Sequence, residues 1–329
     1  MTPADAGAGL TIRPLRGTDL DAVVAIDRSV VGRSRIPFYD RRLAHLERDP
    51  DAFVALAAEQ GGAFAGFALA RLYEGEFGGD APEAALDAIG VAAARRGQGI
   101  ARTLLAYMVQ AMRAGGVHAI ATEAEWSDSG LIGFFVRAGF GLSPHLVLER
   151  RADAATAMTG RDEPDSSAPD FREAAGPPGS LAHDRVPVRS LRPDDLRAIL
   201  RIDRHITGRD RSAYYARKLE EAMRESAVRV SLVAEIDGQV AGFIMARVDF
   251  GEFGNAEPEA VMDTIGVEPG CDHRGVASAL LSQLLTNLGG LRVEKLRTKV
   301  AWNQSSLIGW LDRNGFRPGN RLALRRPVD

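Results

Sequence analysis

Hydrophobic and polar residues follow regular spacings along the first half of the chain, and these spacings predict an order of elements. The segment "LTIRPL" at residues 10–15 alternates as a half-buried strand does, whereas residues 19–30 repeat with the period of an amphipathic helix. A second short helix is expected after Tyr39. Two strands, over 52–59 and 63–73, then follow around a Gly-Gly turn, which is typical of a hairpin.

The apolar pattern continues on both sides of a glycine-rich segment. A strand over 83–91 leads into "RRGQGIARTLL", residues 95–105, and a helix is expected over 98–114 with its apolar residues on one face. The remaining elements are a strand, a helix and a strand, over 117–125, 129–138 and 140–150. The order β-α-α-β-β-β-α-β-α-β predicts an α/β fold, in which a mixed sheet carries helices on both faces.

The second half of the chain repeats this pattern. Aligning Ile12 with Val188 sets an offset of 176 residues, and the same offset relates "LDAIGV" to "MDTIGV" and "LIGFFVRAGF" to "LIGWLDRNGF". Trp126 and Trp302 also correspond. A unit of about 140 residues is too long for a solenoid repeat, so the pattern indicates a tandem duplication of a domain.

A segment without apolar periodicity separates the two copies. Residues 151–186 are rich in Ala, Asp, Pro, Gly and Ser, a composition typical of flexible linkers. We therefore expect one domain over 1–150, the linker over 151–186 and a second domain over 187–329. The total length of 329 residues agrees with two domains.

Charge and composition exclude several classes of protein. The 41 basic and 44 acidic residues give a net charge of −3, which supplies no basic surface for nucleic acid or for an anionic membrane. The single cysteine, Cys271, cannot form an internal disulfide, which suits a reducing compartment. No signal peptide and no apolar stretch of about 20 residues is visible, so we expect a cytoplasmic protein without a membrane span.

The strand, the glycines and the helix around residue 97 are typical of an anion site. A helix N-terminus exposes unpaired backbone N–H groups, and glycines let a phosphate approach them closely. The segment lacks the G-x-x-x-x-G-K-[ST] spacing of a P-loop. It also lacks the third glycine of a dinucleotide loop, where Arg102 stands. The third candidate is the pyrophosphate of coenzyme A.

The order of elements and the segment "VAAARRGQGIA" resemble the GNAT superfamily of N-acetyltransferases, whose acyl-CoA loop reads [QR]-x-x-G-x-[GA]. The first copy matches that loop with Arg96, Gly99 and Ala101, and it has the frequent additional Gly97. The later "FFVRAGF" is similar to the "LYEKLGF" ending of the family. The resemblance covers both copies, and so all of the chain except the linker and the ends.

The resemblance implies that acetyl-CoA is the cofactor. In the family, the pantetheine arm pairs with the strand before the loop, where a backbone N–H polarises the thioester carbonyl, and the loop amides hold the pyrophosphate. The cofactor-binding residues implied in the first copy are Ile89, Val91, Arg96, Gly97, Gln98, Gly99, Ile100 and Ala101. Those implied in the second copy are Val267, Gly275, Val276 and Ala277.

The second loop departs from the family pattern. Asp272 stands where the first copy has Arg96, and His273 stands where it has Gly97. A carboxylate close to a pyrophosphate opposes binding. We therefore expect the first copy to bind acetyl-CoA, while the second copy either binds it weakly or is a structural partner.

Acetyl transfer to an amine needs a base, because the pKa of a free lysine-type amine is about 10.4. Asp87 and its counterpart Asp263 lie on the strand before the loop, where alternation places Asp87 on one face with Ile89 and Val91. These two aspartates, followed by Glu83 and its counterpart Glu259, are the catalytic candidates, and no metal is expected. The competing interpretation is a strand-end Asp that neighbouring amides satisfy.

The general acid of the family is absent from both copies. Many members protonate the leaving thiolate with a tyrosine four residues before the final Gly-Phe, a position that Phe135 and Leu311 occupy here. Glu123 is similar to the frequent fifth-strand glutamate of the family, but Lys299 is its counterpart. No role shared by the two copies follows from that position.

The acceptor side is expected to combine the first two helices with the connection between the third and fourth strands. Arg, Tyr, Glu and Phe residues recur there in both copies, a set that suits a small amine or zwitterion. The substrate-binding candidates are Arg33, Tyr39, Glu76, Phe77, Arg209, Tyr215 and Glu252. Singly, each of these residues is more simply explained by packing or solvation.

Two classes of function remain open from the sequence. The first is an N-acetyltransferase that transfers an acetyl group from acetyl-CoA directly to a primary amine of a small molecule or a protein. The second is a non-catalytic acyl-CoA sensor with a degenerate second domain, which the missing tyrosine favours. The partners expected are an amine acceptor and no nucleic acid or membrane, in a monomer with pseudo-dimeric domains or a homodimer.

Overall fold

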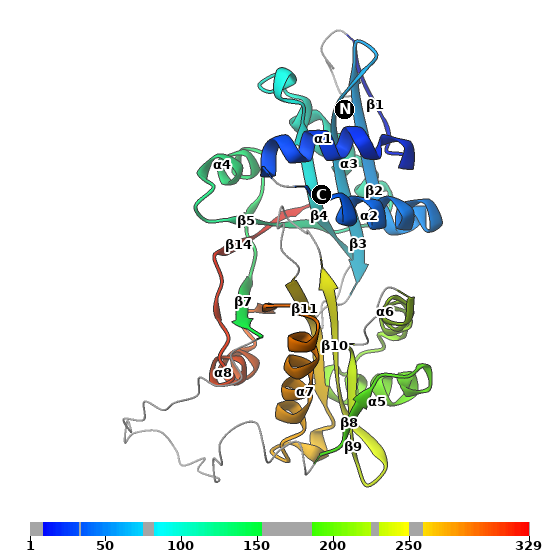
Figure 1. The fold of residues 1–329 in the computed structure, drawn as a ribbon, viewed down its shortest axis with the longest axis vertical. Coiled ribbons are helices and arrows are strands. Elements are labelled where there is room, and N and C mark those ends of the chain that lie inside the picture. The colour runs from blue at the N-terminus through cyan, green and yellow to red at the C-terminus, as the bar shows by residue number, and fades with distance from the viewer. Residues whose placement is uncertain are drawn as a thin grey trace.

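The computed structural model describes residues 9–32, 34–74, 82–152, 186–224, 230–249 and 259–328. They form two mixed sheets of seven strands each, and helices cover both faces of each sheet. The two halves lie one above the other along the longest axis (Figure 1). The predicted mixed α/β fold and the duplication are confirmed.

The elements of the two repeats correspond one to one. The first repeat provides β1 (Leu10–Pro14), α1 (Leu20–Val31), α2 (Ile36–Arg48), β2 (Phe53–Gln60), β3 (Ala63–Glu74), β4 (Pro82–Val91), α3 (Ile100–Ala114), β5 (Ala119–Glu125), α4 (Ser129–Arg137), β6 (Gly141–Leu142) and β7 (His145–Arg151). The second provides β8 (Val188–Ser190), α5 (Leu196–Thr207), α6 (Ser212–Arg224), β9 (Leu232–Ile236), β10 (Gln239–Asp249), β11 (Glu259–Val267), α7 (Val276–Gly290), β12 (Lys295–Ala301), α8 (Ser305–Arg313), β13 (Arg317–Pro318) and β14 (Arg321–Pro327).

Two local predictions differ from the structure. The second helix begins at Ile36, before Tyr39, because Pro37 occupies its first turn, where a missing N–H costs nothing. The last strand predicted for the first copy, over 140–150, is divided into β6 and β7 around Ser143 and Pro144. Since proline has no N–H to donate to a ladder, the division falls where pairing is weakest.

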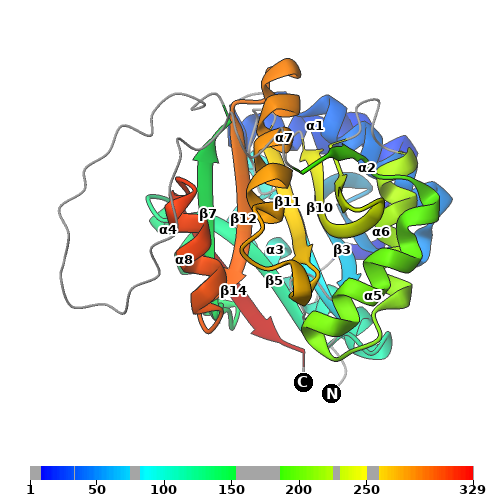
Figure 2. The same ribbon diagram turned by 90° about the horizontal axis from the view of Figure 1, so that it is seen from below.

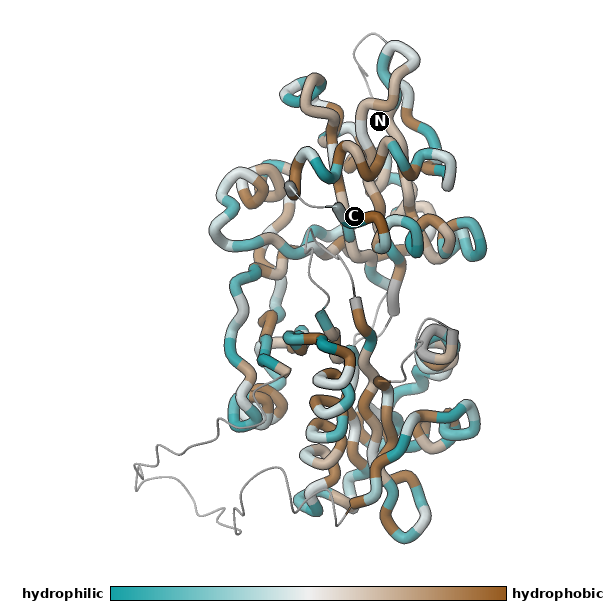
Figure 3. Tube along the Cα trace, in the orientation of Figure 1, coloured by the Kyte–Doolittle hydropathy of each residue, from teal (hydrophilic) through white to brown (hydrophobic). Residues whose placement is uncertain are grey.

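Each sheet packs one apolar layer against α1 and α2, or α5 and α6, and another against α3 and α4, or α7 and α8. Brown, hydrophobic segments follow the strands and the inner sides of the helices, whereas teal segments lie at loops and outer faces (Figure 3). In α3 the buried residues recur at helical spacing and face the sheet, as the sequence predicts.

The last strands of the two repeats are exchanged. The first sheet has the order β1-β2-β3-β4-β5-β14-β6, and the second has the order β13-β7-β12-β11-β10-β9-β8. In the first sheet β14 pairs antiparallel with β5 from Arg321 opposite Glu125 to Pro327 opposite Ala119. In the second, β7 pairs with β12 in the equivalent register. Figure 2 shows β7 beside β12, and Figure 1 shows β14 beside β5 of the first half.

The exchanged strands complete each other's cores. Leu324 of β14 is buried among residues of the first half, and Leu148 of β7 is buried among residues of the second half. Backbone hydrogen bonds hold the crossing segments: Ser143 N–H donates to Ala323 O at 2.9 Å, and Gly319 N–H donates to Val147 O at 2.9 Å. Each half therefore contains about one strand of apolar surface that the other repeat encodes.

Truncating the two exchanged leucines should destabilise the opposite halves. We expect Leu148→Ala and Leu324→Ala each to lower the free energy of unfolding by about 2–5 kcal/mol, because each removes buried methyl groups and leaves a cavity. In hydrogen-exchange mass spectrometry, Leu148→Ala should lower protection first in α7 and β12, and Leu324→Ala first in α3 and β5. Leu142→Ala, at a leucine that is 64% exposed, is the control. Protection lost mainly in the half that encodes the leucine would contradict the exchange.

Candidate active site

The fourth and fifth strands of the first half run parallel and then diverge. β4 pairs with β5 only from Glu83 opposite Ala119 to Ala85 opposite Ala121, although β4 continues to Val91. Beyond that point no strand in the described part of the chain pairs with the β5-facing edge of β4. We call this divergence the splay; the second half has its own, beyond Met262 and Thr298.

A threonine marks the start of each splay. The Thr122 hydroxyl donates a hydrogen bond to Leu86 O at 3.0 Å, and Thr298 does the same to Met262 O at 3.0 Å. Both threonines are at most 4% exposed. The threonine hydroxyl takes the place of a backbone N–H donor from the neighbouring strand. The strands can therefore separate without leaving the carbonyl of Leu86 or Met262 unpaired.

The glycine loop stands at the open end of the splay and leads into α3. Gly97 and Gly99 adopt φ values of 78° and 81°, a left-handed conformation in which glycine is favoured. Among the described residues, none accepts a hydrogen bond from the backbone N–H groups of Gly97, Gln98 or Gly99. These groups lie exposed at a helix N-terminus, where partial positive charge collects, and this arrangement suits a phosphate.

Charge separates the two loops. The first carries Arg95, Arg96 and Arg102 within one turn of the glycines, and Arg96 and Arg102 are exposed. At the equivalent positions the second loop carries Cys271, Asp272 and Ser278, and its one arginine, Arg274, stands where the first loop has Gln98. The second loop keeps the backbone shape, since His273 has φ 62° and Gly275 has φ 79°. Its geometry is therefore conserved, whereas its attraction for an anion is reduced.

The residues predicted to hold the cofactor lie together around this loop. Ile89 and Val91 are partly buried on the α3 side of β4, Ile100 is buried at the first turn of α3, and the loop from Arg96 to Gly99 is exposed. In the second half Val267, Val276 and Ala277 occupy the same places around Gly275. The structure thus brings each set together.

The alternation predicted for Asp87 is wrong. A register shift between Leu69 and Ala70 leaves Asp87 as the extra residue of a bulge in β4, and the next residue, Ala88, already packs on the α1 and α2 side. Asp87 lies on that side too, 3.4 Å from Arg42 Nε and 3.9 Å from Arg71 Nε, whereas Ile89 and Val91 face α3. A bulge shifts the strand period, which the sequence pattern does not reveal.

The bulge of the second half has the same construction. Asp263 is paired with Lys218 Nζ at 3.0 Å and with Arg247, and it is 4% exposed. Burial alone would raise the pKa of Asp263, but Arg247 and Lys218 outweigh it and hold that pKa below its ordinary value. A carboxylate with a lowered pKa, between two cations, is a weak proton acceptor. Asp87 and Asp263 are therefore placed as anchors that tie the bulge to α2 and β3, or to α6 and β10.

A buried triad accompanies each anchor. The Tyr39 hydroxyl donates to Asp27 Oδ1 at 2.8 Å and accepts from Arg35 Nη2 at 2.8 Å, and Arg35 Nε donates to Asp27 Oδ2 at 2.9 Å. Tyr39 is fully buried, and burial raises its pKa well above the ordinary value, against the opposing effect of Arg35. Tyr215, with Asp203 and Arg211, repeats the arrangement.

The two tyrosines therefore lie in the core, and the structure does not support their prediction as acceptor contacts. Of the other acceptor candidates, Arg209 is exposed between α5 and α6. Arg33, Glu76, Phe77 and Glu252 lie outside the described residues. The sequence prediction missed Arg35, Arg42 and Arg71; their counterparts Arg211, Lys218 and Arg247 follow at the same offset of 176 residues, which is the signal that could have found them.

The glutamate candidates lie at the seam, the region where the exchanged strands β7 and β14 pair with β12 and β5. Arg325 of β14 holds Glu83 at 3.0 Å, and Arg297 pairs with Glu123 across the halves and with Glu259 at 3.4 Å. Burial, followed by the charge of Lys299, lowers the pKa of the neighbouring His145. The exchanged strand β14 thus supplies the cation that pairs with Glu83, and the opposite half supplies the one that pairs with Glu123. The cation that pairs with Glu259 lies in the same sheet as Glu259.

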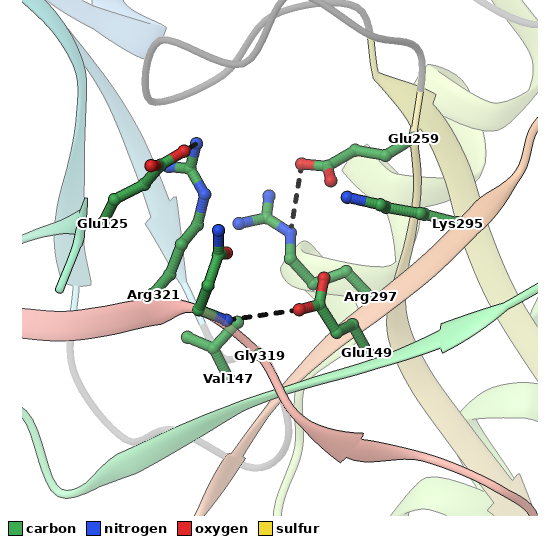
Figure 4. A pocket seen from close by; sticks show the side chains of 9 residues that line it. Glu125, Val147, Glu149, Glu259, Lys295, Arg297, Gly319 and Arg321 are labelled. Carbon is green, nitrogen blue, oxygen red and sulfur yellow. Dashed lines mark hydrogen bonds and ion pairs between the residues drawn. The ribbon is translucent and has the colours of Figure 1, made fainter. Parts of the chain in front are cut away.

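Figure 4 shows the seam around Glu259. A cavity of about 40 Å³, room for about two waters, lies between Glu125, Glu149 and Glu259 on one hand and Lys295, Arg297 and Arg321 on the other. Asn320 N–H donates to Glu149 Oε1 at 3.2 Å. Charged side chains of both signs, from the five strands β5, β7, β11, β12 and β14, thus line the cavity.

The general acid position is apolar in both halves. Phe135 is 2% exposed and packs on Phe140 with ring centroids 5.0 Å apart, and Leu311 is fully buried. Within the described ranges no helix is long and apolar enough to cross a bilayer. The same ranges hold no group of three or more His, Cys, Asp or Glu side chains arranged for a metal ion.

Comparison with known proteins identifies the family. The profile described as "Acetyltransferase (GNAT) family" matches residues 24–140 and 195–316, which together make up more than half of the chain. The chain therefore belongs to the GNAT family of acetyltransferases, with one match in each repeat. The resemblance drawn from the loop is confirmed.

Solved structures share the tandem architecture. A tandem GNAT protein from the clavulanic acid biosynthesis pathway, solved without AcCoA, has 19% identity and a TM-score of 0.63 over 97% of this chain and 99% of its own. A GNAT protein from Sphaerobacter thermophilus has 14% identity and a TM-score of 0.57 over 98% and 97%. A glucosamine N-acetyltransferase region of a fungal multi-domain β-N-acetylglucosaminidase has 14% identity and a TM-score of 0.62 over 97% of this chain, which spans 38% of that protein. At these identities the likeness shows the fold alone.

Removing the charge of a bulge anchor should destabilise the fold. We expect Asp263→Asn to lower the free energy of unfolding by about 3 kcal/mol at pH 7, because it leaves the buried Lys218 and the half-buried Arg247 without a carboxylate. Since the folded pKa of Asp263 is lowered, its stabilisation is present above the unfolded pKa of about 3.9 and is lost as the pH falls through the folded value. The difference between variant and wild type in urea unfolding should therefore shrink below pH 4.

The exposed Asp237→Asn is the matched control, because it makes the same chemical change where no buried cation depends on it. We expect it to alter stability by about 0.5 kcal/mol or less. Equal effects of the two variants at pH 7 would contradict the anchoring role of Asp263.

Proposed function

We propose that the chain is an N-acetyltransferase that moves an acetyl group from acetyl-CoA to a primary amine, with the first half as the active copy. The observation that carries this proposal is the exposed loop Arg96–Gly99 at the open end of the splay, with unpaired backbone N–H groups and three arginines. The splay supplies an unpaired strand edge for the amide groups of a pantetheine arm. Family membership supports the same donor.

The proposed reaction is a direct attack. The neutral amine nitrogen forms a bond to the thioester carbonyl carbon, the C–S bond then breaks, and the coenzyme leaves as a thiolate that takes up a proton. A backbone N–H of the splayed edge of β4 stabilises the oxyanion, as such donors do in other acyl transfers. Proton removal passes through water, because the two aspartates predicted as bases are committed to cations.

The second half is proposed as a degenerate structural partner. Asp272 opposes an anion where the first loop has Arg96, although the backbone shape is kept. The chain is then a monomer in which the two repeats reproduce the two subunits of a dimer. The acceptor, a small-molecule amine or a protein amine, approaches from the α1 and α2 side. With a single cysteine and no expected membrane or nucleic-acid partner, we place the protein in the cytoplasm.

The alternative is an acyl-CoA sensor without turnover. The observation that favours it is the apolar, buried Phe135 and Leu311 at the position of the general acid. A sensor and an enzyme share the binding site and differ in whether the thiol is released in the presence of an amine. The two are therefore separated by a transfer assay rather than by a binding assay.

Calorimetry with acetyl-CoA should count one site in the full chain. We expect Gly99→Glu to weaken binding by at least about tenfold, because it places a carboxylate and a strained backbone in the phosphate loop. Gly275→Glu, the same change in the second loop, should leave the affinity unchanged. The reverse pattern would assign binding to the second half, and two equal sites would contradict a degenerate copy.

Thiol release across a library of amines tests turnover. Wild-type protein should release coenzyme A faster than background hydrolysis with at least one amine, and Gly99→Glu should abolish the increase. Tight binding of acetyl-CoA with only background release for every amine would favour the sensor.

A further inference from the structure

Two tryptophans occupy equivalent exposed positions. Trp126 is 70% exposed and Trp302 is 55% exposed, and the same offset that relates the repeats relates them. Such large aromatic rings are usually buried, since each can remove about 150–250 Å² from water. An exposed ring at the same place in both repeats indicates a surface that a ligand covers.

Each tryptophan stands at the open end of a splay. Pairing between β4 and β5 ends at Ala121, and β5 continues to Glu125, so Trp126 lies about 16 Å further along this arm. On the opposite arm, Val91 ends β4 just before the glycine loop. A molecule that runs from the loop into the splay passes between these two arms.

Trp126 also lies on the same side of the sheet as the glycine loop. Ile120 and Ala124 on β5 pack in the apolar layer that α3 covers, the layer that Ile89 and Val91 also contact. Trp126 follows Ala124 by two residues, which continues the alternation of that strand. The indole therefore stands on the side of the sheet where the loop and the N-terminus of α3 lie.

The backbone of Trp126 is fixed by the exchanged strand. Its N–H donates to Asn320 O at 3.0 Å, and Asp128 N–H donates to Glu125 O at 2.9 Å, so the turn that carries the indole is held on both sides. In the second half Trp302 N–H donates in the same way to Pro144 O at 3.0 Å. A ring held in place before binding loses little conformational entropy when a ligand covers it.

We propose that Trp126 is a binding residue for the pantetheine arm of acyl-CoA, whose amide planes and methylene groups its indole covers at the entrance to the splay. This assignment rests on the proposed function and adds a contact to it. The pantetheine arm is the part concerned, because the proposed function puts the pyrophosphate on the glycine loop, and Trp126 and Val91 stand on the two arms of the splay. Trp302 occupies the equivalent position beside the second loop, where Cys271, Asp272 and Ser278 stand in place of the three arginines of the first loop.

Tryptophan fluorescence tests the assignment directly, since the chain has three tryptophans and Trp310 is partly buried in α8. Acetyl-CoA should change the emission of wild-type protein and of Trp302→Phe, and it should not change that of Trp126→Phe. In calorimetry Trp126→Ala should raise the Kd for acetyl-CoA at least about fivefold, as expected for loss of an aromatic stacking surface. Trp302→Ala should leave the Kd within about twofold.

A fragment of the cofactor tests which end of acetyl-CoA the indole of Trp126 contacts. Adenosine 3′,5′-bisphosphate, which has no pantetheine arm, should compete with acetyl-CoA and leave the emission of Trp126 unchanged. An equal change of emission with this fragment would place the indole at the nucleotide and overturn the assignment.

The remaining outcomes distinguish a failure of the Trp126 assignment from a failure of the proposed function. If wild-type protein binds acetyl-CoA while Trp126→Ala binds it equally well with an unchanged melting midpoint, the tryptophan assignment fails and the proposed function stands. If wild-type protein binds no acetyl-CoA in calorimetry, the proposed function and the assignment fail together. An emission change that appears only when an amine is added would place Trp126 on the acceptor side and overturn the assignment.

Discussion

The reciprocal pairing of β14 with β5 and of β7 with β12 is the constraint on which the rest of the structure depends. It supplies the sixth strand of each sheet, fills part of each core with a leucine from the other repeat, and fixes the backbone of both exposed tryptophans. It also places Arg325 on Glu83, and it brings Arg297 of one sheet onto Glu123 of the other. The two halves are thus joined by sheet hydrogen bonds, apolar packing and buried charge.

The charged residues fall into two groups: those paired inside the protein, which hold the fold, and those exposed at the glycine loops. Five ionic residues, buried or half-buried, and a buried tyrosine connect the first two helices of each half to the bulged strand, and their partners are inside the protein. Ion pairs of this kind contribute more to a defined geometry than to net stability, since desolvation offsets most of their attraction. The glycine loop at the N-terminus of α3 carries Arg95, Arg96 and Arg102, whereas the loop before α7 carries one arginine, Arg274, beside Asp272, and this difference in charge distinguishes the two otherwise equivalent halves.

Much of the fold could be predicted because its signals are local. The period of apolar residues, the Gly-Gly turn and the loop "RRGQGI" each depend on neighbouring residues, and the duplication shows in the chain itself. The bulge at Asp87 could not be predicted, because one extra residue in a strand cannot be recognised from the alternation of apolar residues. For the same reason the sequence assigned Asp87 to the wrong side of the sheet. The exchange could not be predicted either, since β7 presents the same apolar face to either sheet. The burial of Tyr39 depends on Asp27 and Arg35, whose meeting is tertiary.

The exchanged strands also constrain how this chain can change. Asp272 stands in the second loop where the first has Arg96, and under the proposed function a change in the second loop has no cost to binding at the first. The final strand of the same repeat has no such freedom, because it is an internal strand of the first sheet and lies beside β5. A premature stop near the end of the chain would therefore remove part of the opposite half first. The two glycine loops can therefore differ in sequence, whereas neither repeat can be lost without removing a strand from the sheet of the other.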